Sequence, residues 1–281
     1  MPVGLVAIDL DGTLIGADLM IHEVDAQAIR RARDADIAIC LATGRLFDAT
    51  RPFVAKLGLS DPVIALNGAA VYVRTMDDSS YGLARSSPLD RSVALRAYDS
   101  LKRHDFHLQL YYGDRLYLDE LDEGARLYLA ISPVEPVMVP DLRALLVDAL
   151  PAEPGPMKVL AVASPSAVVS EIRVLSRELG ADAHVFRSQP PFLEVTSPSA
   201  DKGAALAWIA QRLGLPMSLT AAVGDSDNDV PMFKAAARSF AVAGATDAAR
   251  AAATALVAAR DRGGVAEAIS AVLYEFAAGR R

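Results

Sequence analysis

Asp9-Leu10-Asp11-Gly12-Thr13 decides the fold of this chain, and it follows directly on an apolar run over residues 3–8. A short run of apolar and β-branched residues indicates a buried strand of a parallel sheet. The two carboxylates then lie at the carboxyl end of that strand, which is the edge where open α/β sheets bind ligands. Gly12 allows a sharp turn at this point because it has no Cβ.

Asp9 and Asp11 are two positions apart, so on a strand their side chains point to the same side. Like charges held close together are costly unless a proton or a cation neutralises them. A hard divalent ion with oxygen ligands suits such a pair, and we therefore expect Mg²⁺. The alternative interpretation is a plain strand-end turn, because Asp and Gly are also turn-forming residues.

Polar, glycine-containing segments follow three further apolar runs, over residues 37–41, 63–66 and 219–223. Helical patterns over 24–34 and 46–57 separate the first strands. This alternation predicts a parallel sheet of βα units with right-handed crossovers, whose turns line one rim. The segments at that rim are Ala42-Thr43-Gly44-Arg45, Asn67-Gly68-Ala69 and Gly224-Asp225-Ser226-Asp227-Asn228-Asp229.

The hydrophobic pattern of the sequence changes near residue 80, where hairpin and helix patterns begin to alternate irregularly. We expect an α+β domain with an antiparallel sheet, inserted into a Rossmann-like α/β core. The expected boundaries are 1–82 for the first part of the core, 83–190 for the insert and 191–281 for the second part of the core. Alanine-rich helices are expected over 248–259 and 264–277.

Taken together, the motifs resemble those of the haloacid dehalogenase (HAD) superfamily of phosphotransferases. The first stretch quoted above resembles its first motif, Thr43 its second, and the segment from Gly224 to Asp229 its fourth. Lys202 in Asp201-Lys202-Gly203 resembles the third motif. The large insert between the second and third motifs is similar in place to the cap of the Cof-like, type IIB-capped phosphatases. The resemblance covers essentially the whole chain and implies a HAD core with a mobile cap domain that closes over the substrate.

The resemblance also implies catalytic roles for four residues. Asp9 would attack phosphorus to form an aspartyl-phosphate, and Asp11 would serve as general acid and then as general base. Thr43 and Lys202 would hold the transferring phosphoryl oxygens. A lysine near a helix N-terminus is electrostatically unfavourable and indicates a compensating anion, although a solvated helix start is the alternative.

A metal site and a substrate site are implied as well. Mg²⁺ would be held by Asp9, Asp11 (through its backbone carbonyl), Asp225 and Asp229. Substrate contacts are expected from Thr43, Gly44, Arg45, Asn67, Lys202 and Asn228. Arg45 could instead form a salt bridge at a helix start, and Asn228 could simply shape its turn. Within the insert, Lys158 either reaches an anionic substrate or lies at a solvated surface.

The composition restricts the partners that we expect. A net charge of −7 favours neither nucleic acid nor an anionic membrane. Cys40 is the single cysteine, so no internal disulfide forms, and no basic and apolar leader precedes the first strand. We therefore expect a cytoplasmic protein, monomeric or homodimeric, whose partner is a small phosphorylated metabolite.

The predicted function is Mg²⁺-dependent hydrolysis of such metabolites, with sugar phosphates as the leading class. A phosphomutase or phosphotransferase that uses the same site is one alternative. A non-catalytic sensor of phosphorylated ligands is the other.

Overall fold

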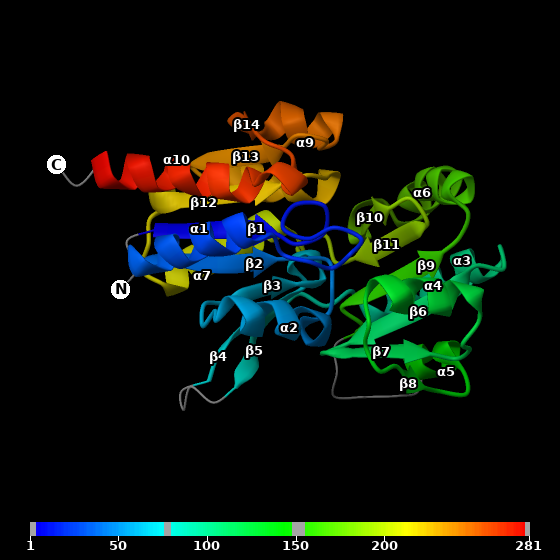
Figure 1. The fold of residues 1–281 in the computed structure, drawn as a ribbon. Coiled ribbons are helices and arrows are strands. Elements are labelled where there is room, and N and C mark those ends of the chain that lie inside the picture. Colours follow the sequence, from blue (N-terminus) through cyan, green and yellow to red (C-terminus); the bar gives the residue numbers. More distant parts are fainter. Residues whose placement is uncertain (1–3, 76–79, 148–154, 279–281) are drawn as a thin grey trace. The chain divides into compact units, whose positions relative to one another are not determined.

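The computed structural model describes residues 4–75, 80–147 and 155–278, which fall into two compact units (Figure 1). The first unit comprises the described residues up to Thr43, then Thr50–Ala84, and those from Asp201 onward. The second unit comprises Gly44–Ala49 and Arg85–Ala200. The predicted class, a parallel α/β core with an inserted α+β part, is confirmed.

An eight-stranded sheet forms the centre of the first unit, in the order β14-β13-β12-β1-β2-β3-β4-β5. The strands from β14 to β3 run parallel, and β4 is antiparallel to β3. Their bounds are β1 Gly4–Asp9, β2 Ile37–Ala42, β3 Val63–Ala65, β4 Ala70–Arg74, β5 Tyr81–Ser86, β12 Thr220–Gly224, β13 Arg238–Val242 and β14 Ala255–Val257.

β1 and β12 are neighbours in this sheet, and the chain leaves them in opposite directions. From β1 it proceeds to β2 and β3, and from β12 it proceeds to β13 and β14. Such a reversal of strand order is the switch point at which doubly wound sheets bind their ligands. The carboxyl ends of β1 and β12 are therefore where a site is expected.

Helices cover both faces of this sheet. Figure 1 shows α1 and α10 side by side, and α7 packs against α8. Small and apolar residues of β1 and β2 pack with Leu206, Ile209 and Phe233, which come from α7 and α8. The helices are α1 Glu23–Asp34, α2 Phe47–Leu57, α7 Lys202–Arg212, α8 Val230–Ala235, α9 Asp247–Ala252 and α10 Gly264–Ala278.

A six-stranded sheet forms the centre of the second unit, in the order β10-β11-β9-β6-β7-β8. All its neighbours are antiparallel except β7 and β8. The strands are β6 His107–Tyr112, β7 Arg115–Leu118, β8 Val137–Met138, β9 Lys158–Val162, β10 His184–Gln189 and β11 Phe192–Thr196. The helices are α3 Arg91–Lys102, α4 Glu123–Ile131, α5 Leu142–Val147 and α6 Pro165–Leu179.

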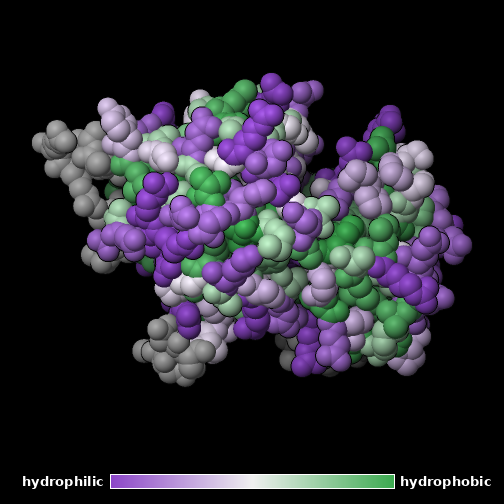
Figure 2. All heavy atoms as spheres, viewed as in Figure 1, coloured by the Kyte–Doolittle hydropathy of each residue, from purple (hydrophilic) through white to green (hydrophobic). Residues whose placement is uncertain are grey.

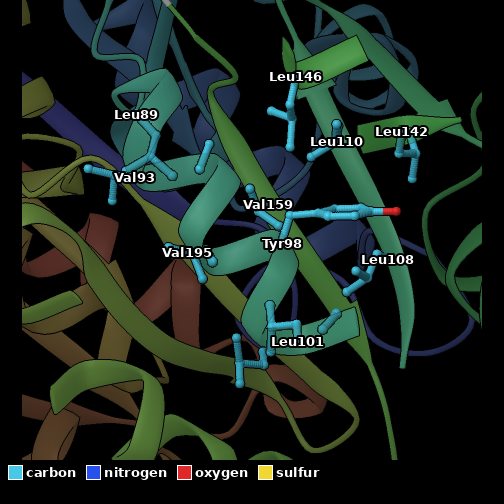
Figure 3. Close-up of a cluster of buried hydrophobic side chains, with 14 of the residues drawn as sticks. Leu89, Val93, Tyr98, Leu101, Leu108, Leu110, Leu142, Leu146, Val159 and Val195 are labelled. Carbon is cyan, nitrogen blue, oxygen red and sulfur yellow. The ribbon is translucent and has the colours of Figure 1, made fainter. Parts of the chain in front are cut away.

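Alternation along these strands divides the second sheet into two faces. On one face Leu108, Leu110, Val159 and Val195 pack against side chains of α3 and α5 in a buried hydrophobic cluster (Figure 3). The other face carries buried polar side chains. These are Gln109, Tyr111, Lys158, Glu194 and Thr196.

The surface follows the expected polarity. Figure 2 shows hydrophilic side chains over the outward face of α1, where Arg30 and Arg31 are exposed. Across the described ranges, no helix combines the length and the apolar character that crossing a bilayer requires.

The structure differs from the sequence-based expectations in three places. β11 lies between β10 and β9, so the second unit continues to Ala200 and does not end at residue 190. The segment Gly44–Ala49, expected in the core, belongs to the second unit. The helix expected over 248–259 ends at Ala252, and β14 follows because Thr254 exchanges hydrogen bonds with Ser239, which lies on β13.

Candidate active site

Asp9 ends β1, and Asp225 directly follows β12, the neighbouring parallel strand. The Thr13 hydroxyl donates to Asp225 Oδ1 over 3.0 Å and so fixes that carboxylate. Gly12 has φ +87°, and a Cβ built there would lie 2.5 Å from Asp225 Oδ2. The turn after β1 therefore requires glycine, both for its backbone conformation and for the close approach of Asp225.

Asp229 is the fully buried acceptor of this region. Its Oδ2 accepts from the backbone N–H groups of Asp225 (2.9 Å) and Ser226 (3.0 Å). Ser226 and Asp229 form a reciprocal capping box at the short 3-10 turn Asp227–Asp229. Ser226 Oγ also donates to Asn228 Oδ1 over 2.6 Å, so this serine shapes the turn. The turn thus orients Asp229 through both backbone and side-chain groups.

Lys202 is the first residue of α7, and its side chain is completely buried. Its Nζ lies 2.6 Å from Asp9 Oδ1 and 2.6 Å from Asp229 Oδ1. These two carboxylates supply the anionic charge that a lysine at a helix N-terminus needs. The alternative of a solvated helix start is therefore wrong.

The pKa values show that negative charge is in excess in this region. Burial and then Asp229 raise the pKa of Asp9 well above its ordinary value, against the effect of Lys202. Burial and Asp229 likewise raise the pKa of Asp225 to about 6. Burial would lower the pKa of Lys202, but Asp229 and Asp9 outweigh it and raise that pKa above its ordinary value.

A divalent cation fits this charge distribution. One carboxylate oxygen from each of Asp9, Asp225 and Asp229, here called the acidic triad, lies within 4.8 Å of the others. Among the described residues, Asp9 Oδ2 is a buried oxygen without a hydrogen-bond partner. Three carboxylates face a single ammonium group, and hard oxygen ligands of this kind suit Mg²⁺. The residues present therefore fit a bound divalent ion.

Thr43, Asn67 and Asn228 lie at neighbouring loops of the first unit. Thr43 is buried just beyond β2, and its carbonyl accepts from the Asn67 N–H over 2.9 Å. Asn228 Nδ2 donates to Asn67 Oδ1 over 2.9 Å. The structure thus brings three residues of the predicted substrate site together, and their contacts with a substrate stay a prediction.

Asp11, Gly44 and Arg45 are placed differently. The side chain of Asp11 is not part of the acidic triad, and its predicted backbone ligation and acid–base role stay predictions. Gly44 and Arg45 belong to the second unit, where the Gly44 carbonyl accepts from Lys158 Nζ over 3.1 Å. Their predicted contacts with substrate also stay predictions.

Lys158 does not lie at a solvated surface, and that alternative is wrong. Its side chain is 1% exposed, lies 3.2 Å from Glu194 Oε2 and stacks over the Tyr111 ring at 4.5 Å. Thr13 is the residue that the sequence analysis missed as a partner of Asp225. The place of Thr13 in the first motif was the available signal for a site residue, but nothing in the sequence identified Asp225, 212 positions away, as its acceptor.

Comparisons with known proteins identify relatives of this chain. Residues 6–269 match the family model of haloacid dehalogenase-like hydrolases. A 5-amino-6-(5-phospho-D-ribitylamino)uracil phosphatase of Bacillus subtilis is 26% identical over 87% of this chain and 86% of its own length. A phosphoglycolate phosphatase of Pyrobaculum aerophilum is 30% identical, with 97% of each chain covered. A solved structure from Thermotoga maritima superimposes with a TM-score of 0.79 at 26% identity, over 96% of this chain and 97% of that one.

Proposed function

The chain belongs to the haloacid dehalogenase-like hydrolase family and is a phosphatase of small phosphorylated metabolites, and from this premise we propose that it acts through an aspartyl-phosphate on Asp9. One observation carries the proposal. Asp9, Asp225 and Asp229 offer oxygens within 4.8 Å of one another, and Lys202 is bonded to Asp9 over 2.6 Å. The Asp9 carboxylate, the candidate cation site and the Lys202 ammonium group therefore lie together at the carboxyl ends of β1 and β12.

Each group has a chemical task in this proposal. Asp9 attacks phosphorus in line, and the leaving oxygen takes a proton from Asp11. Water activated by Asp11 then hydrolyses the aspartyl-phosphate. Lys202 and Thr43 hold the phosphoryl oxygens, whose negative charge is greatest in the transition state. The acidic triad would hold a Mg²⁺ ion, which would supply positive charge to offset the repulsion between Asp9 and the phosphate.

The substrate proposal concerns a class, with sugar phosphates first. The Bacillus relative is named for a substrate that carries phosphate on a ribityl chain, and the Pyrobaculum relative for phosphoglycolate. Both are small phosphate monoesters, yet their carbon skeletons differ. A panel of sugar, polyol and carboxylic acid phosphates therefore tests the class, and the highest kcat/KM on sugar phosphates is the expected result.

The test of the mechanism is Asp9→Asn, assayed by phosphate release from p-nitrophenyl phosphate and from the panel with added Mg²⁺. The variant should lose activity at least 10³-fold while its circular dichroism stays unchanged. Asp227→Asn is the control, because Asp227 is an exposed carboxylate in the turn that carries Asp229 and lies outside the acidic triad. Retained hydrolysis by Asp9→Asn rejects the nucleophile.

Two further measurements separate the alternatives. In ¹⁸O-labelled water a hydrolase places the label in released phosphate, whereas a mutase or phosphotransferase moves the phosphoryl group to a second hydroxyl without it. Absence of Mg²⁺-dependent phosphate release from every panel member, together with EDTA-insensitive binding of a phosphorylated ligand, favours the sensor.

A further inference from the structure

The turn between β3 and β4 has an unusual backbone. Leu66, Asn67 and Gly68 have φ values of 50°, 56° and 96°, so three successive residues adopt left-handed conformations. Asparagine and glycine tolerate this region, but leucine pays a steric penalty of about 1–2 kcal/mol. Leu66 is nevertheless fully buried and Asn67 is 2% exposed. A strained, buried turn persists only where its surroundings determine it.

This turn touches three of the segments that carry predicted site residues, all within the first unit. The backbone N–H of Asn67 donates to the Thr43 carbonyl over 2.9 Å. The side-chain oxygen of Asn67 accepts from Asn228 Nδ2 over 2.9 Å. A Cβ on Gly68 would lie 2.2 Å from the carbonyl oxygen of Asp201, the residue before Lys202. The turn therefore sets the spacing between these three segments.

Asn228 is held from two sides. Its amide nitrogen donates to Asn67, and its amide oxygen accepts from Ser226 Oγ over 2.6 Å. An amide with a fixed donor and a fixed acceptor partner has one orientation. Removing the Asn67 side chain takes away one of these two partners of Asn228 and leaves the hydrogen bond from Ser226 in place.

We propose that Asn67 is a positioning residue, which acts on the reaction through Asn228 by fixing its amide relative to Thr43 and Lys202. This proposal rests on the phosphatase site described above and assigns Asn67 a role that requires no contact with substrate. The left-handed backbone follows from this role, because it lets one residue offer its N–H to Thr43 and its side-chain oxygen to Asn228.

The experiment is a double-mutant cycle in kcat/KM on p-nitrophenyl phosphate with Mg²⁺. Asn67→Gly removes the side chain and keeps the positive φ accessible, so the loop retains its backbone. We expect kcat/KM to fall about tenfold, with most of the loss in kcat, because a misplaced group weakens the transition state. In the Asn228→Ala background, the same change should lower kcat/KM less than twofold, because its target is already gone.

Asp36→Gly is the matched control, since Asp36 also has a positive φ (61°) in the first unit and is exposed. It should leave kcat/KM unchanged, and thermal unfolding of every variant shows that the comparison is between folded enzymes. A tenfold loss that persists undiminished in the Asn228→Ala background overturns the proposal, because Asn67 then acts independently. No loss in Asn67→Gly also overturns it. Asp9→Asn decides the proposed mechanism separately, so the two failures are distinguishable.

Discussion

Asp229→Asn tests the charge arrangement of the site more directly than any other single change. The Asp229 carboxylate serves three donors, with Lys202 on Oδ1 and the N–H groups of Asp225 and Ser226 on Oδ2. An amide has only one oxygen. In the variant, an NH₂ group must therefore face either the buried ammonium or the two backbone N–H groups.

Two opposing contributions determine the free energy of unfolding. A hydrogen bond to a charged group is worth about 1.5–3 kcal/mol, and a donor left facing a donor adds to the loss, so we estimate about 3 kcal/mol. Removing a carboxylate also relieves repulsion with Asp9 and Asp225. Asp229 is the second cause, after burial, of the raised pKa of both residues, so this relief offsets part of the loss. The expected net loss is about 2 kcal/mol at neutral pH in the presence of EDTA.

Urea unfolding in EDTA, followed by the fluorescence of Trp208, measures this loss. Trp208 is the single tryptophan and lies on α7, so its signal reports on the first unit. Asp227→Asn is the control, because Asp227 is exposed and its contact with Thr246 Oγ1 survives an amide oxygen. The control should change stability by less than about 0.5 kcal/mol. An Asp229→Asn variant as stable as the original would show that repulsion outweighs the hydrogen bonds, which refutes the reasoning.

Three further outcomes follow from other contacts. Gly12→Ala inserts a Cβ 2.5 Å from Asp225 Oδ2, and calorimetry should show Mg²⁺ binding weakened at least tenfold. Gly113→Ala is the control, because Gly113 has φ +55° and nothing lies within 4 Å of a Cβ built there. It should leave Mg²⁺ binding unchanged and cost only about 1–2 kcal/mol of backbone strain. Lys158→Met removes the ammonium group that lies 3.2 Å from Glu194 Oε2, although Ser188 Oγ still donates to Oε1 of this buried carboxylate. Losing this counter-charge should lower the free energy of unfolding by about 3–5 kcal/mol, most of which Lys158→Met/Glu194→Met should recover, and a double variant no more stable than the single one contradicts this reasoning. Burial lowers the pKa of His107 in the folded chain, so the unfolded chain takes up the proton first as the pH falls. The contribution of neutral His107 to stability should be complete above the ordinary histidine pKa and should decline below it. In His107→Gln, the urea midpoint should therefore depend less on pH between about pH 7.5 and about pH 5.5.

The sequence predicts the parallel core well because its evidence is local. Apolar runs followed by polar turns place Asp9, Thr43 and Asp225 at strand ends, and strand ends of a parallel sheet meet at one edge. The sequence-based prediction fails for β14, because residues 255–257 were expected to continue an alanine-rich helix and form a strand instead. Propensity favours helix there, but Thr254 pairs with Ser239 on the neighbouring strand, and this long-range pairing decides the outcome.

The candidate site divides in the same way. Residue types and spacing indicate an acidic cluster with a lysine, because each motif is contiguous in the sequence. They do not indicate that Lys158 is buried with Glu194, since the expected boundary between residues 190 and 191 placed Glu194 in the core and Lys158 in the insert. Nor do they reveal the hydrogen bond between Asn67 and Asn228, whose partners are 161 positions apart. Which residue pairs with which across such distances depends on the tertiary fold and cannot be seen in a local sequence pattern.

The site also shows why this part of the chain is not built for maximal stability. Two glycines let carboxylates approach the backbone closely, since a Cβ on Gly12 or Gly224 would lie 2.5 Å from Asp225 or Asp229. These carboxylates outnumber the single ammonium of Lys202, and burial first and Asp229 second raise the pKa values of Asp9 and Asp225. In the proposed mechanism a divalent cation would offset this negative charge and so allow an anionic phosphate to approach Asp9. The cost of burying these carboxylates together is therefore consistent with the proposal that the site holds a cation and a phosphoryl group.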